Sequence, residues 1–136
     1  MPRSPLPAEL ARFLAKPRHA VVGTVREDGA PVTSACWYGL AADGRVVLSM
    51  GEESHRLRHL REEPRVALTV LGDSWYAHLS VLGRAVEFRS DRDLADIDGL
   101  SNRYEGVPYE DRDYRGVTVL VEVDAWHTWG DPAAEA

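Results

Sequence analysis

The sequence is poor in cysteine and has no long apolar run, and each shortage excludes a class of protein. Its 136 residues include one cysteine, Cys36, which rules out an intrachain disulfide and a multi-cysteine zinc site. No apolar stretch approaches the roughly 20 residues of a membrane-spanning helix, and residues 1–7 lack the basic and apolar regions of a signal peptide. We therefore expect a cytoplasmic protein without a membrane segment.

The chain also lacks an excess of positive charge. Its 16 basic and 22 acidic residues give a formal net charge of −6, which argues against a general binder of nucleic acid or anionic membranes. Any site for an anion must therefore be built from a few local basic side chains. The length and the ordinary hydrophobic content predict a single domain over residues 1–130, with a flexible tail at 131–136.

Alternating and β-branched segments predict a mainly β protein. Strands are expected over residues 21–25, 32–38, 46–49, 66–71, 76–88 and 117–123. The dipeptides Asp28-Gly29 and Asp43-Gly44 are typical of tight turns between strands. Short amphipathic helices are expected over residues 6–16 and 91–104. Six strands joined by tight turns indicate an antiparallel barrel with short peripheral helices.

Another short helix is predicted between the third and fourth strands, with Ser54 as its N-cap and Pro64 as its stop. Its first amide groups, together with His55, Arg56 and Arg58, are suited to holding an anion such as a phosphate. The alternative is an amphipathic linker helix, in which Glu52–Arg56 and Arg58–Glu62 form ordinary pairs on an exposed face. The local sequence leaves both interpretations open.

Motifs of catalysis and metal binding are missing. His55 and His59 are four residues apart, but Arg56 stands where a metal-binding HExxH helix carries glutamate, so no metal site is expected. There is no GxSxG elbow, no phosphate-binding glycine loop and no GxGxxG. Catalytic residues therefore cannot be assigned from motifs.

Aromatic residues gather near the ends of the predicted strands. There they can form the wall of a pocket for a flat ring, or simply pack in the core or at an interface. The residues of this set are Trp37, Tyr38, Trp75, Tyr76, Trp126 and Trp129.

Taken in order, these motifs resemble the pyridoxamine 5′-phosphate oxidase-like split-barrel superfamily, and within it the branch that uses the deazaflavin coenzyme F-420. The similarity runs from about Pro17 to Gly130 and is most specific at Ser49, at residues 54–66, at residues 81–85 and at the closing Trp129-Gly130. The resemblance implies a six-stranded antiparallel split β-barrel that forms a homodimer. A flavin or deazaflavin would lie in the groove between the two subunits.

The resemblance also implies which residues bind the cofactor. Ser54, His55 and Arg56 match the phosphate motif, and Arg58 matches a basic position of the same helix. Residues 33–37 would run along the ring system, and a histidine would reach the cofactor of the partner subunit. The full implied set is Thr33, Ser34, Ala35, Cys36, Trp37, Ser49, Ser54, His55, Arg56, Arg58 and His78.

By the same resemblance, the expected activity is hydride transfer between coenzyme F-420, or FMN as second choice, and a small, largely apolar organic substrate. Tyr38, His78 and Tyr104 are candidate proton donors. Thr33 and His55 stand where FMN oxidases of the superfamily carry arginine. This difference leaves an alternative open, in which the chain is a non-catalytic split-barrel dimer that binds a flavin, a deazaflavin or haem.

Overall fold

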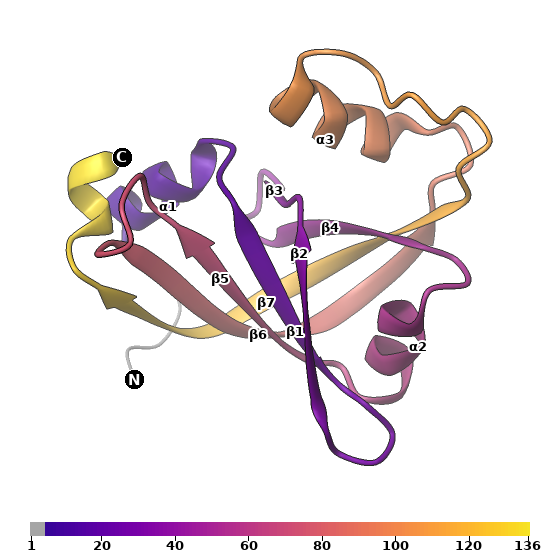
Figure 1. Ribbon diagram of the computed structural model, residues 1–136, viewed down its shortest axis with the longest axis horizontal. Helices are drawn as coiled ribbons and strands as arrows, with labels where there is room; N and C mark the ends of the chain where they lie inside the picture. The colour runs from indigo at the N-terminus through magenta and orange to yellow at the C-terminus, as the bar shows by residue number, and fades with distance from the viewer. Residues whose placement is uncertain (1–4) are drawn as a thin grey trace.

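A single antiparallel sheet of seven strands organises the protein, whose computed structural model describes residues 5–136 (Figure 1). The strands follow the spatial order β2-β1-β5-β6-β7-β4-β3, and every neighbouring pair is antiparallel. Their bounds are β1 (Ala20–Val25), β2 (Pro31–Cys36), β3 (Gly39–Leu40), β4 (Val46–Gly51), β5 (Arg65–Leu71), β6 (His78–Ser90) and β7 (Gly116–Trp129).

The mainly β, antiparallel split-barrel prediction is confirmed, with seven strands in place of six. The additional strand is the two-residue β3, which pairs with β4. The predicted strand 32–38 ends early, at Cys36, because Tyr38 turns into the core. There the Tyr38 hydroxyl donates to the carbonyl groups of Leu14 and Lys16, at 3.0 and 2.8 Å.

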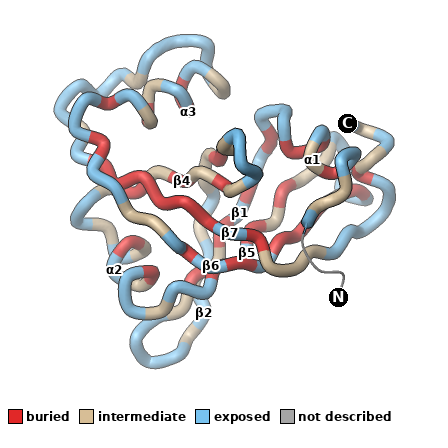
Figure 2. The backbone as a smooth tube through the Cα atoms, turned by 180° about the vertical axis from the view of Figure 1, so that it is seen from behind, coloured by how far each residue is buried: buried red, intermediate tan, exposed pale blue. Residues whose placement is uncertain are grey.

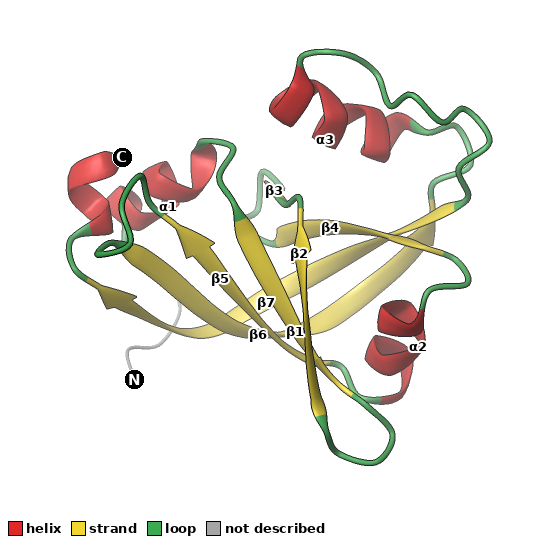
Figure 3. Cartoon of the chain, in the orientation of Figure 1, coloured by secondary structure: helices red, strands yellow, loops and turns green. Residues whose placement is uncertain are grey.

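Within the described residues, three α-helices and one 3-10 helix lie around the sheet, as the cartoon shows (Figure 3). They are α1 (Ala8–Ala15), α2 (His55–Glu62), α3 (Ala95–Glu105) and η1 (Pro132–Glu135). Buried residues alternate along most strands and continue onto the inner faces of α1 and α2 (Figure 2). None of the helices within residues 5–136 is long and apolar enough to cross a membrane.

Helix α2 follows the sequence prediction closely. The Ser54 side chain caps it by accepting a hydrogen bond from the Leu57 amide at 3.3 Å. Leu57 and Leu60 are buried, and the helix ends two residues before Pro64. Because the cap fixes where the helix begins, it also fixes the direction of the Arg56 side chain, two residues further on.

Helix α3 begins later than predicted, at Ala95 rather than near Asp91. Leu94, immediately before it, has a positive φ of 64°, a conformation that non-glycine residues rarely adopt. The buried Asp91 carboxylate still caps the helix, since it accepts the amide protons of Asp96 and Ile97 at 3.0 and 2.8 Å. The predicted role of Asp91 near the helix start is kept, although a loop separates it from the helix.

Residues 131–136, for which the sequence predicts a flexible tail, carry η1. Pro132 in this segment is buried. The Glu135 carbonyl accepts hydrogen bonds from Arg18 and Lys16, and its carboxylate accepts one from the Asp73 amide. The end of the described chain is therefore tied to the segment between α1 and β1 and to the β5–β6 loop.

Gly83 allows β6 and β7 to come unusually close. The pairing register shifts between Leu82 and Gly83, as in a β-bulge. A Cβ atom on residue 83 would lie 2.1 Å from the Glu122 carbonyl oxygen, which is far inside van der Waals contact. Glycine is therefore required at this point of the longest strand pair.

We predict that Gly83→Ala lowers the free energy of unfolding by about 2 kcal/mol or more, because two backbones must separate. Gly99→Ala is the matched control, since a Cβ at this exposed helical position meets nothing within 4 Å. That change should raise the unfolding free energy by about 0.5 kcal/mol through helix propensity. Urea unfolding measures the change in unfolding free energy for both variants. Equal changes in the two variants would contradict the close approach of β6 and β7 at Gly83.

Candidate functional site

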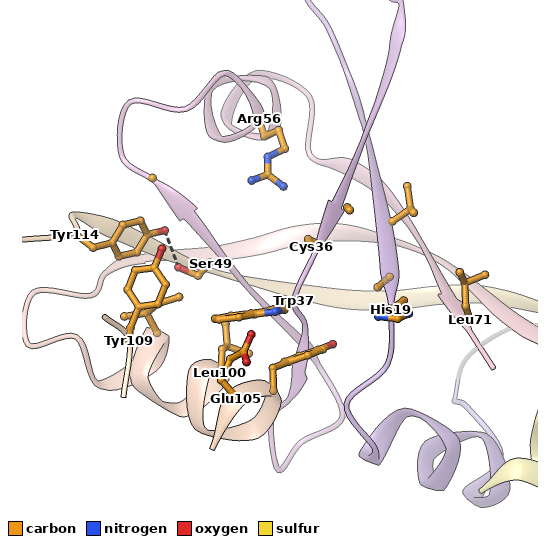
Figure 4. Close-up of a pocket in the computed structure, with 16 residues that line it drawn as sticks. His19, Cys36, Trp37, Ser49, Arg56, Leu71, Leu100, Glu105, Tyr109 and Tyr114 are labelled. Atoms are coloured by element: carbon orange, nitrogen blue, oxygen red, sulfur yellow. Dashed lines mark hydrogen bonds between the residues drawn. The ribbon is translucent and has the colours of Figure 1, made fainter. Parts of the chain in front are cut away.

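One large cavity, of about 950 Å³, brings together segments that are far apart in the sequence (Figure 4). It lies between the ends of β1, β2 and β4, the first turn of α2, helix α3 and the loop that follows α3. The residues that line it are His19, Ala20, Val21, Ala35, Cys36, Trp37, Ser49, Gly51, Arg56, Leu71, Ile97, Leu100, Tyr104, Glu105, Tyr109 and Tyr114.

Arg56 gives one end of the cavity a positive charge. Its side chain extends from α2 into the cavity (Figure 4), and its Nη1 is buried without a hydrogen-bond partner among residues 5–136. Within these residues Arg56 also forms no ion pair, so the Glu52–Arg56 pair of the linker-helix interpretation is not formed. A buried, unpaired guanidinium N–H is costly, and an anion in the cavity would supply its missing partner.

Two hydroxyl groups lie at the same end of the cavity. Ser49, near the end of β4, shares a hydrogen bond of 3.0 Å with Tyr114, in the loop before β7. Burial raises the pKa of Tyr114 above its usual value, while the Ser49 hydrogen bond and the Arg56 charge act in the opposite direction. The phenol is therefore protonated at neutral pH and retains a proton to donate. Gly116 leaves room for this ring, since a Cβ there would lie 2.4 Å from it.

Aromatic rings form the opposite wall. Trp37, just after β2, stacks on Tyr104 of α3 with ring centroids 5.4 Å apart and an interplanar angle of 11°. Tyr109 contacts Trp37 edge-on at 6.1 Å and Tyr114 at 5.2 Å. With the buried Ile97 and Leu100, these rings make α3 and its loop an apolar wall suited to a flat ring.

The candidate proton donors differ in their positions. The Tyr104 hydroxyl donates to the Arg18 carbonyl at 2.7 Å, and the Tyr38 hydroxyl is bound by carbonyl groups at the end of α1. Burial raises the pKa of both phenols. Their protons are thus directed to the main chain rather than into the cavity. His78, on β6, lies outside the cavity lining.

The structure brings together five of the eleven residues that the resemblance implies. Ala35, Cys36, Trp37, Ser49 and Arg56 line the cavity. The other six do not: Thr33, Ser34, Ser54, His55, Arg58 and His78.

These six residues have other surroundings. Ser54 caps α2, and it borders a smaller cavity of about 370 Å³ together with Arg58. The exposed Arg58 and His55 side chains lie 3.0 Å apart, between Nη2 and Nδ1. Thr33 and Ser34 belong to β2, the first strand of the sheet order, which pairs with β1 alone in the described chain.

Sequence reasoning missed Tyr109, Tyr114 and His19 as lining residues. Tyr109 and Tyr114 lie in an irregular segment with no motif, and Ser49 is 65 residues away from Tyr114. The presence of two tyrosines in that segment was the one sequence feature that could have indicated a role in lining a cavity. The described residues contain no group of three or more His, Cys, Asp or Glu side chains placed to hold a metal ion.

The family model for pyridoxamine 5′-phosphate oxidase matches residues 6–130 of the chain. No curated protein matches the chain at a significant level.

Several solved structures share the fold. A protein named F420 reductase is 26% identical over 91% of this chain and 98% of its own, with a TM-score of 0.78. The conserved hypothetical protein Rv2991 from Mycobacterium tuberculosis is 24% identical, with 98% and 90% of the two chains covered and a TM-score of 0.75. A haem-binding protein from Mycobacterium smegmatis is 22% identical over 93% of this chain and 55% of its own, with a TM-score of 0.68.

The reactivity of the Cys36 thiol reports on the electrostatics of the cavity. Burial raises the pKa of its thiol to about 11, and the Arg56 charge partly opposes this effect. Because only the thiolate reacts, we predict that alkylation in the folded protein is slow at pH 8 and accelerates about tenfold per pH unit up to pH 11. Arg56→Gln should slow it further by removing the charge that stabilises the thiolate.

Iodoacetamide labelling followed by mass spectrometry measures these rates. Arg12→Gln, on the exposed face of α1, is the control for a change in net charge. The urea-unfolded chain should react like an ordinary cysteine. Fast labelling of the folded protein at pH 8 would contradict the buried, protonated thiol.

Proposed function

Because the chain belongs to the pyridoxamine 5′-phosphate oxidase family, we propose that it is an oxidoreductase that uses coenzyme F-420, with FMN as second choice. One observation carries the proposal: a large, aromatic-walled cavity contains a buried guanidinium N–H without a partner. The structural similarity to an F420 reductase supports the choice of the deazaflavin. The substrate would be a small, largely apolar organic molecule.

Arg56 is the proposed anchor for the cofactor phosphate. Its free Nη1 would donate to a phosphate oxygen, and the Ser49–Tyr114 pair, which keeps one hydroxyl proton outside its mutual hydrogen bond, would donate beside it. Ser54 acts indirectly, by fixing the first turn of α2. Arg58, on the outer side of the same turn, adds positive charge near the phosphate without lining the cavity, and its Nη2 lies 3.0 Å from Nδ1 of His55.

Strand β2 is the proposed support for the ring system. Its Ala35 and Cys36 line the cavity, and β1 is its only neighbour in the described sheet. Alternate N–H and C=O groups of residues 33–37 are therefore free of the β1–β2 ladder and available to the polar edge of a ring. Trp37 and Tyr104 close the apolar side.

The bound deazaflavin or flavin supplies the hydride chemistry. The protein supplies binding, orientation and an environment from which water is excluded. The β2 amide groups would donate to the polar edge of the ring, and Arg56 would compensate the phosphate charge. This division of tasks agrees with the lack of a recognisable acid–base or nucleophile motif in the sequence.

We propose that the protein forms a homodimer through the outer face of the sheet, which is the face turned away from the buried core. In the centre of this face, strands β2, β1, β5, β6 and β7 present no charged residue among those described. The register places on it Thr33, Ala35, Val21, Gly23, Ala67, Thr69, Leu71, His78, Ser80, Leu82, Ala125, His127 and Trp129. A scarcity of charged side chains is typical of the core of a dimer interface. His78 lies on this face, consistent with a role toward the partner's cofactor.

A second candidate is a non-catalytic dimer that binds haem. His19 lines the cavity and offers an imidazole, a common axial ligand of haem iron. This candidate predicts haem uptake that His19→Ala abolishes, with no reduction of small substrates by reduced F-420. Absorbance titration and a substrate screen separate the two proposals.

We predict that Arg56→Gln weakens F-420 binding by about tenfold to a hundredfold, since a charged hydrogen bond contributes about 1.5–3 kcal/mol. Arg58→Gln should change it only about twofold, by reducing the local potential. Titration of the cofactor's fluorescence measures both affinities. Equal losses in the two variants, or no loss in Arg56→Gln, would remove Arg56 as the anchor.

We predict that Leu82→Arg, on the outer sheet face, converts the dimer to monomers in light scattering at micromolar concentration. Leu82 is 38% exposed, and a guanidinium there would be buried against the partner at a high desolvation cost. Val107→Arg is the matched control, because Val107 is 56% exposed in the loop after α3. A dimer that both variants retain would place the interface elsewhere.

A further inference from the structure

Glu105 places an unpaired carboxylate in the lining of the cavity. It is the last residue of α3 and directly follows Tyr104 (Figure 4). The other two acidic side chains of this helix, Asp96 and Asp98, each pair with an arginine. Among the described residues, the Glu105 side chain accepts no hydrogen bond and forms no ion pair. Its negative charge is therefore available to a ligand in the cavity.

Aromatic rings lie next to this carboxylate in the cavity wall. Tyr104 stacks on Trp37 at 5.4 Å, and Tyr109 meets Trp37 edge-on at 6.1 Å. The faces of such rings attract cations, tryptophan most strongly, and the attraction grows where water is excluded. Rings and a carboxylate together favour an organic cation whose charge is spread over a flat ring. The net charge of −6 on the whole chain acts in the same direction.

Arg56 is the one arginine in the cavity lining, and it lies at the end away from the aromatic stack (Figure 4). In the free protein its charge opposes the entry of a cation. A phosphate bound at Arg56 would offset this charge and leave Glu105 as the dominant charged group at the apolar end. The cavity with its cofactor bound would thus attract a cation more strongly than the empty cavity.

A cationic substrate also needs no proton from the apolar end of the cavity. The Tyr104 hydroxyl donates to the Arg18 carbonyl at 2.7 Å, so its proton is directed away from the cavity. In a flat cation with a C=N⁺ group, a ring carbon accepts a hydride, the positive charge is lost and the product is neutral. The hydride comes from the reduced cofactor, which is oxidised by its loss.

We infer that the substrates are flat organic cations with a delocalised C=N⁺ group, held between the Trp37–Tyr104 wall and the Glu105 carboxylate. This inference rests on the proposed function and names the substrate class of the same cavity. A ring with a delocalised charge is still largely apolar, so it suits the aromatic wall. Glu105 selects the substrate by its charge, while the bound cofactor supplies the chemistry.

The test compares two ligands that share one ring system. N-methylacridinium is a flat cation that accepts a hydride at a ring carbon, and acridine is the same ring system without the methyl group, uncharged at pH 8. The wild type should bind the cation about tenfold more tightly than acridine. Calorimetric titration measures both affinities, first in the protein alone and then with oxidised F-420 present. Equal affinities for the two ligands in both states overturn the inference.

Glu105→Gln should weaken N-methylacridinium binding about threefold to fivefold and leave acridine binding within about twofold, because it removes one partly exposed charge. Glu110→Gln is the matched control, since Glu110 is exposed in the loop after α3 and does not line the cavity. It makes the same change in net charge and should leave both affinities unchanged. Equal losses of cation binding in the two variants would mean that overall charge, rather than Glu105, attracts the ligand, and would reject the inference.

Turnover separates this inference from the proposed function. With reduced F-420, the wild type should convert N-methylacridinium to its neutral dihydro product, and Glu105→Gln should raise KM about threefold to fivefold with little change in kcat. A protein that binds F-420 but does not prefer the cation retains the proposed function and rejects this inference. A preference for the cation that depends on Glu105, in a protein that binds neither F-420 nor FMN, supports the cation site and rejects the proposed cofactor.

Discussion

The carbonyl groups at the end of α1 hold the cavity wall in place. Leu14, Ala15 and Lys16 lack partners for these groups within the helix, and the Arg103 guanidinium donates to all three at 2.8–2.9 Å. The positive charge also suits the negative end of the helix dipole. Because Arg103 precedes Tyr104 in α3, this contact fixes the ring that stacks on Trp37. A helix at one end of the sheet thereby positions the aromatic wall of the candidate site.

The cavity has a charged end and an apolar end. This arrangement suits a ligand with an anionic group at one end and a flat, apolar ring at the other. Arg56, Ser49 and Tyr114 gather donors at one end, although the chain as a whole is acidic. The Trp37–Tyr104 stack lines the other end. A nucleotide-like cofactor with a flat ring and a phosphate matches both ends at once. With the proposed cofactor bound, the protein would need no reactive side chain of its own, because its groups would orient the ring and compensate the phosphate charge.

Sequence patterns of a few residues predicted the turns and the helix cap correctly. Gly29 and Gly44 have positive φ values of 87° and 89° at the two predicted turns, and Ser54 caps α2 as its sequence indicates. Prediction failed where distant segments decide the structure. The left-handed Leu94 opposes its own preference, and tertiary packing fixes it. Tyr114 reaches Ser49 through a loop without periodicity, so no local pattern shows that the two residues share a cavity. The family resemblance named Arg56, but only the fold separates its orientation from that of Arg58.

The acceptors that fix Arg103 are main-chain oxygens, which every amino acid carries. The side chains of Ala15 and Lys16 are exposed and contribute nothing to this contact beyond their backbone. Mutations at these two helix positions can therefore accumulate without moving the wall of the cavity. Arg103 has no such freedom, because lysine lacks the planar fork that reaches several carbonyl groups together. Residues 15 and 16 should therefore vary freely among relatives of this protein, whereas Arg103 should be retained.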